Sequence, residues 1–298
     1  MLLAPGLPVG PRPRLDLAGA ASVTGALALL VFALVGANDA GWTSGRTLGL
    51  FGGAAALLAL FLLIEIRVRE PLVPLGIFRA RGFSSGAFLT ALLGAAWIPT
   101  WYFISLYLQQ VLGTSALRTG LAYLPMTLVL IVIMLGAISR LIGRFGLTTL
   151  TVGGLAILAA GAALFARVPA HGSYLADVLP ASLVTAVGMA LAFVPIMIGG
   201  LSGARPEDAG LASGLLNTAY QVGSALGLAV AVALAASRTA GQAGSGHIAA
   251  LTTGFAGGFA LAAGIALIGA VVGLALLRRP HARTEEAAEQ GESERLAM

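Results

Sequence analysis

The sequence predicts an all-α polytopic membrane protein with eight transmembrane helices. Mean hydropathy is +0.95, which is far above that of a soluble domain. Of 298 residues, 58% are hydrophobic and only 10% are charged. The 41 glycines fit helices that pack closely within a bilayer. Apolar runs of about 20 residues, the length that crosses a hydrocarbon core, recur along the chain.

The apolar runs are separated by short polar or proline-containing segments. We expect spans at residues 18–37, 47–66, 86–108, 119–138, 147–166, 174–200, 211–236 and 248–277. Residues 1–17 are predicted to be a cytoplasmic loop-like amino terminus, 71–85 a cytoplasmic linker and 278–298 a disordered cytoplasmic tail. Prolines 99, 125 and 195 fall inside spans, where each can kink its helix.

The arginines predict the orientation. All 17 basic residues are arginine, and they lie at span ends rather than along a stripe, which argues against nucleic-acid binding. An even number of spans places both chain ends on one side. Loops on that side hold every arginine except Arg46, Arg118, Arg167 and Arg238. The positive-inside rule then places both termini in the cytoplasm of a bacterial-type cell (plasma) membrane.

The seventh span carries an uncharged polar stripe. Ser213, Asn217, Tyr220, Gln221 and Ser224 recur at steps of three and four, which places them on one helix face. At membrane depth such a stripe needs a partner helix or a water-filled cavity.

Two glycine pairs in the same segment, Gly210 with Gly214 and Gly223 with Gly227, have the four-residue spacing that lets a neighbouring backbone approach.

Two spans supply candidates for a substrate path. Asn217, Tyr220 and Gln221 offer hydrogen bonds without the cost of inserting a charge. The third span offers Trp97 and Trp101, one turn apart, with Thr90 on the same face. Aromatic faces can hold hydrophobic or cationic small molecules. The alternative is that the amides bond to neighbouring helices and the tryptophans simply pack.

A proton-carrying carboxylate at the centre of a span is missing from the sequence. Glu65 lies at a span end beside Arg67, where we expect it to reach water or pair; Asp39 lies in a loop, and Asp177 near the start of the sixth span. None is central.

No catalytic or metal-binding constellation is apparent. The sequence has no cysteine, and its three histidines are scattered. We therefore expect no cofactor, no metal and no enzymatic activity.

Four stretches resemble one transporter family. Tyr107–Pro125 (YLQQVLGTSALRTGLAYLP) and Glu207–Ala229 (EDAGLASGLLNTAYQVGSALGLA) resemble segments in the second half of the fourteen-span drug:proton antiporters. These are the EmrB/QacA-like branch of the major facilitator superfamily. Arg14–Gly19 (RLDLAG) and Pro71–Phe78 (PLVPLGIF) resemble the flanks of the two extra central helices of that branch.

The resemblance implies a domain arrangement and a function. Residues 18–70 would be two linker transmembrane helices, and 86–277 a carboxy-terminal six-helix transporter bundle. The amino-terminal six-helix half, in the same or a separate chain, would be missing. In the intact family the activity is proton-coupled efflux of drugs, with the coupling acids in that missing half. We therefore expect this chain to be inactive alone.

The family's cytoplasmic gating motif has a counterpart here. Gly136, Arg140, Arg144 and Gly146 match it as gating-motif candidates. Gly143 stands where the family usually has aspartate, and Leu147 where it usually has a basic residue. These departures weaken the case for a charge-relay gate.

Two other functions compete with that of an exporter fragment. The first is a non-transporting membrane partner, or a split half-transporter that assembles with a separate amino-terminal half. The second is a membrane-embedded enzyme, which the lack of any catalytic constellation disfavours.

Overall fold

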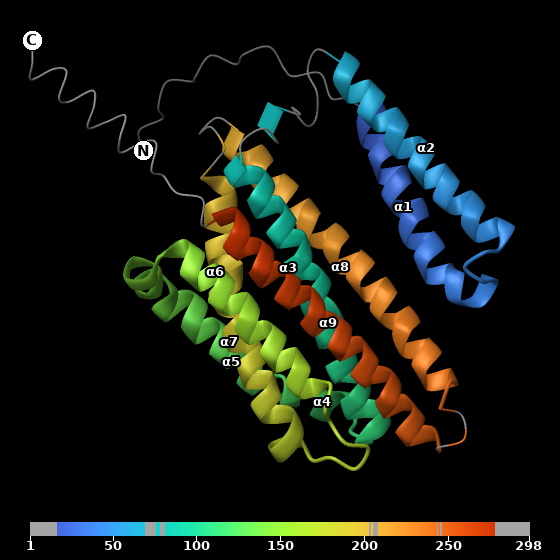
Figure 1. Ribbon diagram of the computed structural model, residues 1–298, viewed down its shortest axis with the longest axis vertical. Helices are drawn as coiled ribbons and strands as arrows, with labels where there is room; N and C mark the ends of the chain where they lie inside the picture. Colours follow the sequence, from blue (N-terminus) through green and yellow to red (C-terminus); the bar gives the residue numbers. More distant parts are fainter. Residues whose placement is uncertain are drawn as a thin grey trace, which may run out of the picture. The chain divides into compact units, whose positions relative to one another are not determined.

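The computed structural model describes residues 17–68, 76–77, 81–202, 204, 208–242, 244 and 246–277. All regular structure in these ranges is helical (Figure 1). The chain divides into two compact units, Met1–Arg79 and Ala80–Met298. Residues Arg205, Glu207, Arg69 and Glu70 and the terminal segments 1–16 and 278–298 lie outside the described residues, so the expectations for them are untested.

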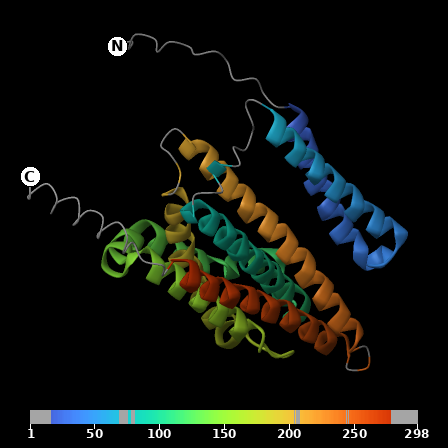
Figure 2. The same ribbon diagram turned by 45° about the horizontal axis from the view of Figure 1, so that its top comes forward.

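The first unit is a helical hairpin of α1 (Leu17–Ala40) and α2 (Gly45–Arg67), which pack along each other (Figure 2). The connection turns at Gly41, whose φ of 88° is the left-handed conformation that favours glycine. Ser44 then caps α2, because its side chain accepts a hydrogen bond from the Thr47 backbone N–H. The Glu65 side chain, which was expected to reach water or to pair, is only 4% exposed and so does not extend into water.

The second unit is a bundle in which α3 packs against α7, α8 and α9, and α6 packs against α7 and α9. Its α-helices are α3 (Arg81–Leu106), α4 (Ala116–Ala122), α5 (Leu124–Ile131), α6 (Ile138–Phe165), α7 (Leu179–Leu201), α8 (Ala209–Ala240) and α9 (His247–Leu277). Three π-helical segments continue them: η2 (Tyr107–Val111), η3 (Val132–Ala137) and η4 (Tyr174–Val178).

Six helices in the described residues are long and apolar enough to cross a membrane. One of them, Ala116–Phe165, is 50 residues long. A straight helix of that length would reach about 75 Å, more than twice the hydrocarbon thickness. Within it Gly146 has φ 77° and ψ 161°, so α6 is broken there and the two flanking limbs are separate helices. The predicted spans 119–138 and 147–166 lie on either side of this break.

The bundle core has two layers of apolar side chains. One layer is centred on Leu93, Met126 and Leu158. The other is aromatic: the Phe259 ring stacks on Phe165 with centroids 5.0 Å apart and meets Phe103 edge-on at 5.8 Å. These layers hold the long helices in register around the cavity described below.

Helices α3 and α8 approach each other backbone to backbone. A methyl group added at Gly223 or Gly227 would overlap the carbonyl oxygen of Ala91 or Ala95, respectively. The Ala95 carbonyl lacks its usual intrahelical donor because the residue four positions on is Pro99. The close approach predicted for Gly223 and Gly227 is therefore confirmed. Gly210 and Gly214 have open space instead.

The other two prolines differ in position. Pro195 lies inside α7. One turn before this proline, at Leu191 and Ala192, the α7 backbone lies so close to α6 that a methyl group added at Gly154 would overlap it. Pro125 was expected inside a helix, but α4 ends at Ala122 and Pro125 lies in the first turn of α5. Proline is well tolerated there, since its missing N–H has no intrahelical partner.

Three tyrosines tie one end of the bundle together. The hydroxyl of Tyr107 donates to the Pro169 carbonyl at 2.7 Å. The hydroxyl of Tyr123 donates to the Trp101 carbonyl at 2.7 Å, and that of Tyr174 donates to Ala122 at 2.8 Å. These bonds join α3, the α4–α5 junction and the segment between α6 and α7.

Replacing Tyr107 by phenylalanine is expected to destabilise the bundle by about 1 kcal/mol, because a hydrogen bond from a fully buried side chain is lost. The midpoint of thermal unfolding should fall by roughly 2–4 °C. The matched control is Tyr102→Phe, since Tyr102 is exposed and no hydrogen bond of its hydroxyl is found within the described residues. Equal midpoints for the two variants would contradict the assignment.

Candidate functional site: a cavity in the helix bundle

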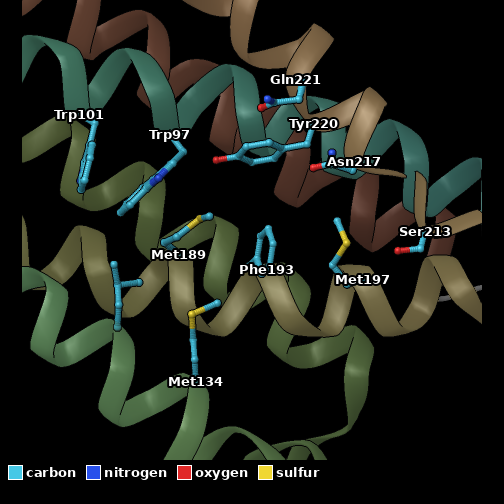
Figure 3. A pocket seen from close by; sticks show the side chains of 11 residues that line it. Trp97, Trp101, Met134, Met189, Phe193, Met197, Ser213, Asn217, Tyr220 and Gln221 are labelled. Atoms are coloured by element: carbon cyan, nitrogen blue, oxygen red, sulfur yellow. The ribbon is translucent and has the colours of Figure 1, made fainter. Parts of the chain in front are cut away.

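A cavity of about 580 Å³ opens in the second unit between α3, α5, η3, α7 and α8. Figure 3 shows the side chains that line it. They are Trp97, Trp101, Leu130, Met134, Met189, Phe193, Met197, Ser213, Asn217, Tyr220 and Gln221. This volume suits a drug-sized molecule.

The α8 wall is formed by the predicted polar stripe. Ser213, Asn217, Tyr220 and Gln221 line the cavity because steps of three and four return to one helix face. Ser224, the fifth predicted member, is buried instead and donates to the Tyr220 carbonyl at 2.7 Å. In the described part of the chain, no hydrogen bond engages the side chains of Ser213, Asn217 or Gln221. Their polar groups are thus available to a molecule in the cavity.

The α7 wall is apolar and was not predicted. Met189, Phe193 and Met197 stand four residues apart and face α8 across the cavity (Figure 3). Phe193 meets the Tyr220 ring edge-on, with centroids 6.1 Å apart. A usable signal was present in the sequence, because Met189, Phe193 and Met197 are spaced four residues apart within one predicted span. Methionine adapts its shape to varied partners.

The α3 wall is aromatic. The rings of Trp97 and Trp101 have centroids 6.2 Å apart and are tilted by 31°. Trp97 is 7% exposed and Trp101 40% exposed, so only the second ring is substantially open. Tyr123 supports it, with ring centroids 4.9 Å apart.

The structure brings five of the six predicted substrate-path residues into one cavity and leaves out the sixth. Thr90 is fully buried and does not line the cavity. Its hydroxyl has no hydrogen-bond partner among the described residues. Thr90 lies two turns before Trp97 in α3 and faces the packed interior of the bundle instead.

The gating-motif candidates do not line the cavity; they lie in η3 and α6, before and at the break at Gly146. Arg140 and Arg144 are exposed there, and the Arg144 guanidinium lies 5.4 Å from the centre of the Phe145 ring. Gly146 makes the turn itself, and Gly136 has open space around it. The four residues therefore cluster along one chain segment.

The cavity wall is electrically neutral, since none of its eleven described side chains is charged. Asp177 is half-buried in η4, where it accepts a hydrogen bond from the Ser173 backbone N–H at 2.7 Å. Glu65 belongs to the other unit. Within the described ranges no group of three or more His, Cys, Asp or Glu residues is placed to hold a metal ion. The wall can offer stacking, dispersion and neutral hydrogen bonds.

Bundles of membrane-length helices with a cavity between them are typical of membrane transport proteins. The family model of the Major Facilitator Superfamily matches residues 14–228, which is most of the chain. The chain belongs to the major facilitator superfamily, as its sequence predicted, and is an integral membrane protein.

Several curated relatives carry names of export or resistance proteins. The chain is 36% identical to the cephamycin export protein CmcT of Amycolatopsis lactamdurans over 233 residues, covering 78% of the chain and 48% of that protein. It is 31% identical to the puromycin resistance protein pur8 of Streptomyces alboniger over 290 residues, 95% of the chain and 57% of that protein. It is 36% identical over 229 residues to the tetracenomycin C resistance and export protein of Streptomyces glaucescens, 75% of the chain and 41% of that protein. The chain spans about half the length of these relatives.

Proposed function

We propose that this chain is the carboxy-terminal part of a drug or solute efflux transporter of the fourteen-span antiporter branch. The single observation that carries this function is the neutral cavity between α3, α7 and α8, lined by aromatic, thioether and amide side chains. Such a lining accepts hydrophobic or cationic small molecules. The export proteins among the relatives favour the same activity.

The proposed arrangement has eight membrane spans. The break at Gly146 makes two limbs of Ala116–Phe165, and α1, with 24 residues, is long enough for a further span. The hairpin α1–α2 would then be the pair of linker helices, and the second unit the carboxy-terminal six-helix bundle. With both termini cytoplasmic, the Gly146 turn and its arginines face the cytoplasm of a bacterial plasma membrane.

A second six-helix half is the proposed partner. On α8 the side chains of Ser213, Asn217, Thr218 and Gln221 are exposed, although they lie on a membrane-length helix. Polar groups at that depth need protein or water around them rather than lipid. Gly210 and Gly214 on the same helix have open space in which another helix can approach. These features support a partner half that covers this face of α8.

Proton coupling would depend on that partner. Moving one charge through about 100 mV supplies roughly 2.3 kcal/mol, whereas a tenfold solute gradient costs about 1.4 kcal/mol. One proton per substrate is therefore sufficient if a membrane-embedded carboxylate carries it. The described cavity wall has none, so we assign the carboxylate to the partner half and expect no export by this chain alone.

Membrane vesicles test this proposal. Vesicles that hold only this chain should show no export of Nile red, an uncharged flat dye, driven by a pH gradient. Vesicles in which the chain is fused behind the amino-terminal half of the cephamycin export protein CmcT should export it. A fusion with Trp101→Ala should lose most of that activity, because the open aromatic face of the cavity is removed.

Two outcomes would contradict the proposal. Export by the chain alone would show that no partner half is needed. An inactive but correctly folded fusion would favour the alternative function, a membrane partner that does not itself transport.

A further inference from the structure

We infer that the cavity selects elongated, flat, uncharged molecules that carry hydrogen-bonding groups along one long edge. This inference rests on the proposed function, because it takes the cavity to be the substrate site. It goes further by choosing between the hydrophobic and the cationic compounds that the aromatic residues alone would admit.

Two rows of side chains, one on α7 and one on α8, line the cavity along its length. On α8, Ser213, Asn217 and Gln221 are spaced four residues apart, and on α7 Met189, Phe193 and Met197 have the same spacing. Eight residues of helix rise about 12 Å, so each row is about 12 Å long. Figure 3 shows Asn217 and Gln221 across from the α7 row, with the Tyr220 ring between them and Ser213 beyond Met197 at one end. The space between the two rows is a slot along the helix axes.

The α7 and α8 rows differ in chemistry. The α7 row offers two thioethers and a phenyl ring, which form dispersion contacts and no strong hydrogen bond. The α8 row offers one hydroxyl and two amides, each able to donate and accept, without a hydrogen-bond partner in the described part of the chain. A molecule that fits between them needs one apolar edge and one polar edge.

Indole rings line the end of the slot at α3. Trp97 and Trp101 lie beside Met189 there (Figure 3), and their rings are tilted by only 31°. The open Trp101 face, with the buried Trp97 ring behind it, provides a platform for a flat ring system, since offset stacking favours planar partners.

The described cavity wall carries no negative charge. A cation that enters the slot loses hydration and gains only the attraction of aromatic faces. A neutral molecule with the same rings avoids that loss. The wall therefore favours the uncharged compound.

Binding to the chain itself tests the inference. The chain has three tryptophans, so Trp42→Phe leaves Trp97 and Trp101 as the fluorescent groups. Their quenching reports binding of three flat three-ring probes: 1,8-dihydroxyanthraquinone, which is neutral with a polar edge; anthracene, which has no polar edge; and 9-aminoacridine, which is cationic. We expect the dihydroxyanthraquinone to bind roughly tenfold more tightly than either of the others.

A pair of substitutions tests the polar row. Asn217→Leu combined with Gln221→Leu should weaken binding of 1,8-dihydroxyanthraquinone roughly tenfold and leave that of anthracene within about twofold. The matched control is Thr218→Val on the same helix: Thr218 is exposed, does not line the cavity, and its hydroxyl bonds to the Gly214 carbonyl at 2.9 Å. It should change neither affinity.

Tighter binding of 9-aminoacridine than of the dihydroxyanthraquinone would overturn the inference, as would equal affinities for all three probes. An unchanged affinity in the Asn217/Gln221 double variant would also overturn it. The ranking of probes is measured with every cavity residue unchanged, so it does not depend on the Asn217/Gln221 double variant being folded. If no probe binds, the proposed substrate cavity fails as well; if probes bind without the expected preference, only this inference fails.

Discussion

Replacing Gly223 by leucine is expected to destabilise the second unit severely. A methyl group at this position already overlaps the Ala91 carbonyl of α3, and backbone atoms cannot move aside as a side-chain end can. Forced separation of α3 and α8 should cost about 3 kcal/mol or more, because overpacking of a dense interior is strongly destabilising. Fluorescence-detected gel filtration after a heating series would measure the loss, expected to be roughly 10 °C or a failure to recover folded protein.

The matched control for this prediction lies nine residues earlier in α8. Gly214→Leu makes the same substitution in the same helix, but nothing lies within 4 Å of the added atom. Its unfolding midpoint should stay close to that of the parent chain. If the two leucine variants unfold at the same temperature, the backbone contact between α3 and α8 does not hold the unit together.

Replacing Gly146 by valine is expected to produce the second large effect. At φ 77° and ψ 161° the backbone occupies a region that is almost exclusive to glycine. A β-branched residue there costs about 1–3 kcal/mol in strain, or the turn changes shape and the limbs on either side of it lose their packing. A lower yield of folded protein and an unfolding midpoint lower by roughly 5 °C are expected in the same assay.

Gly143→Val is the control for the turn. Gly143 lies three residues earlier, is helical and has open space around it, so valine meets no strain there. Valine also has a higher helix propensity than glycine. Comparable losses in the two valine variants would show that the conformation of Gly146 is not what the break requires.

The sequence was sufficient to predict the helices, because membrane length and hydropathy are local properties. The apolar run 248–277, for example, became α9 over His247–Leu277. The polar face of α8 was equally predictable, since the three- and four-residue spacing of Asn217, Tyr220 and Gln221 fixes their common direction. Membership of the major facilitator superfamily also followed from local motifs.

Other features depended on which helices meet. Glu65 was expected to reach water or to pair at the end of its span, and the structure buries its side chain. Thr90 shares a helix face with Trp97 in the sequence pattern, but the packing of neighbouring helices encloses it and leaves the tryptophans at the cavity. The spacing of residues along one helix shows on which face of that helix a side chain lies, but not which neighbouring helix it meets.

By itself the sequence determined a helical membrane protein of the major facilitator superfamily, the position of its helices and a polar stripe along α8, because all of these depend on residues close together in the chain. Only the tertiary structure decided that Gly223 and Gly227 touch α3 while Gly210 and Gly214 touch nothing, and that Met189, Phe193 and Met197 complete the cavity. The physical reason is that contacts between helices are set by the packing of whole surfaces, which the pattern within one helix does not contain.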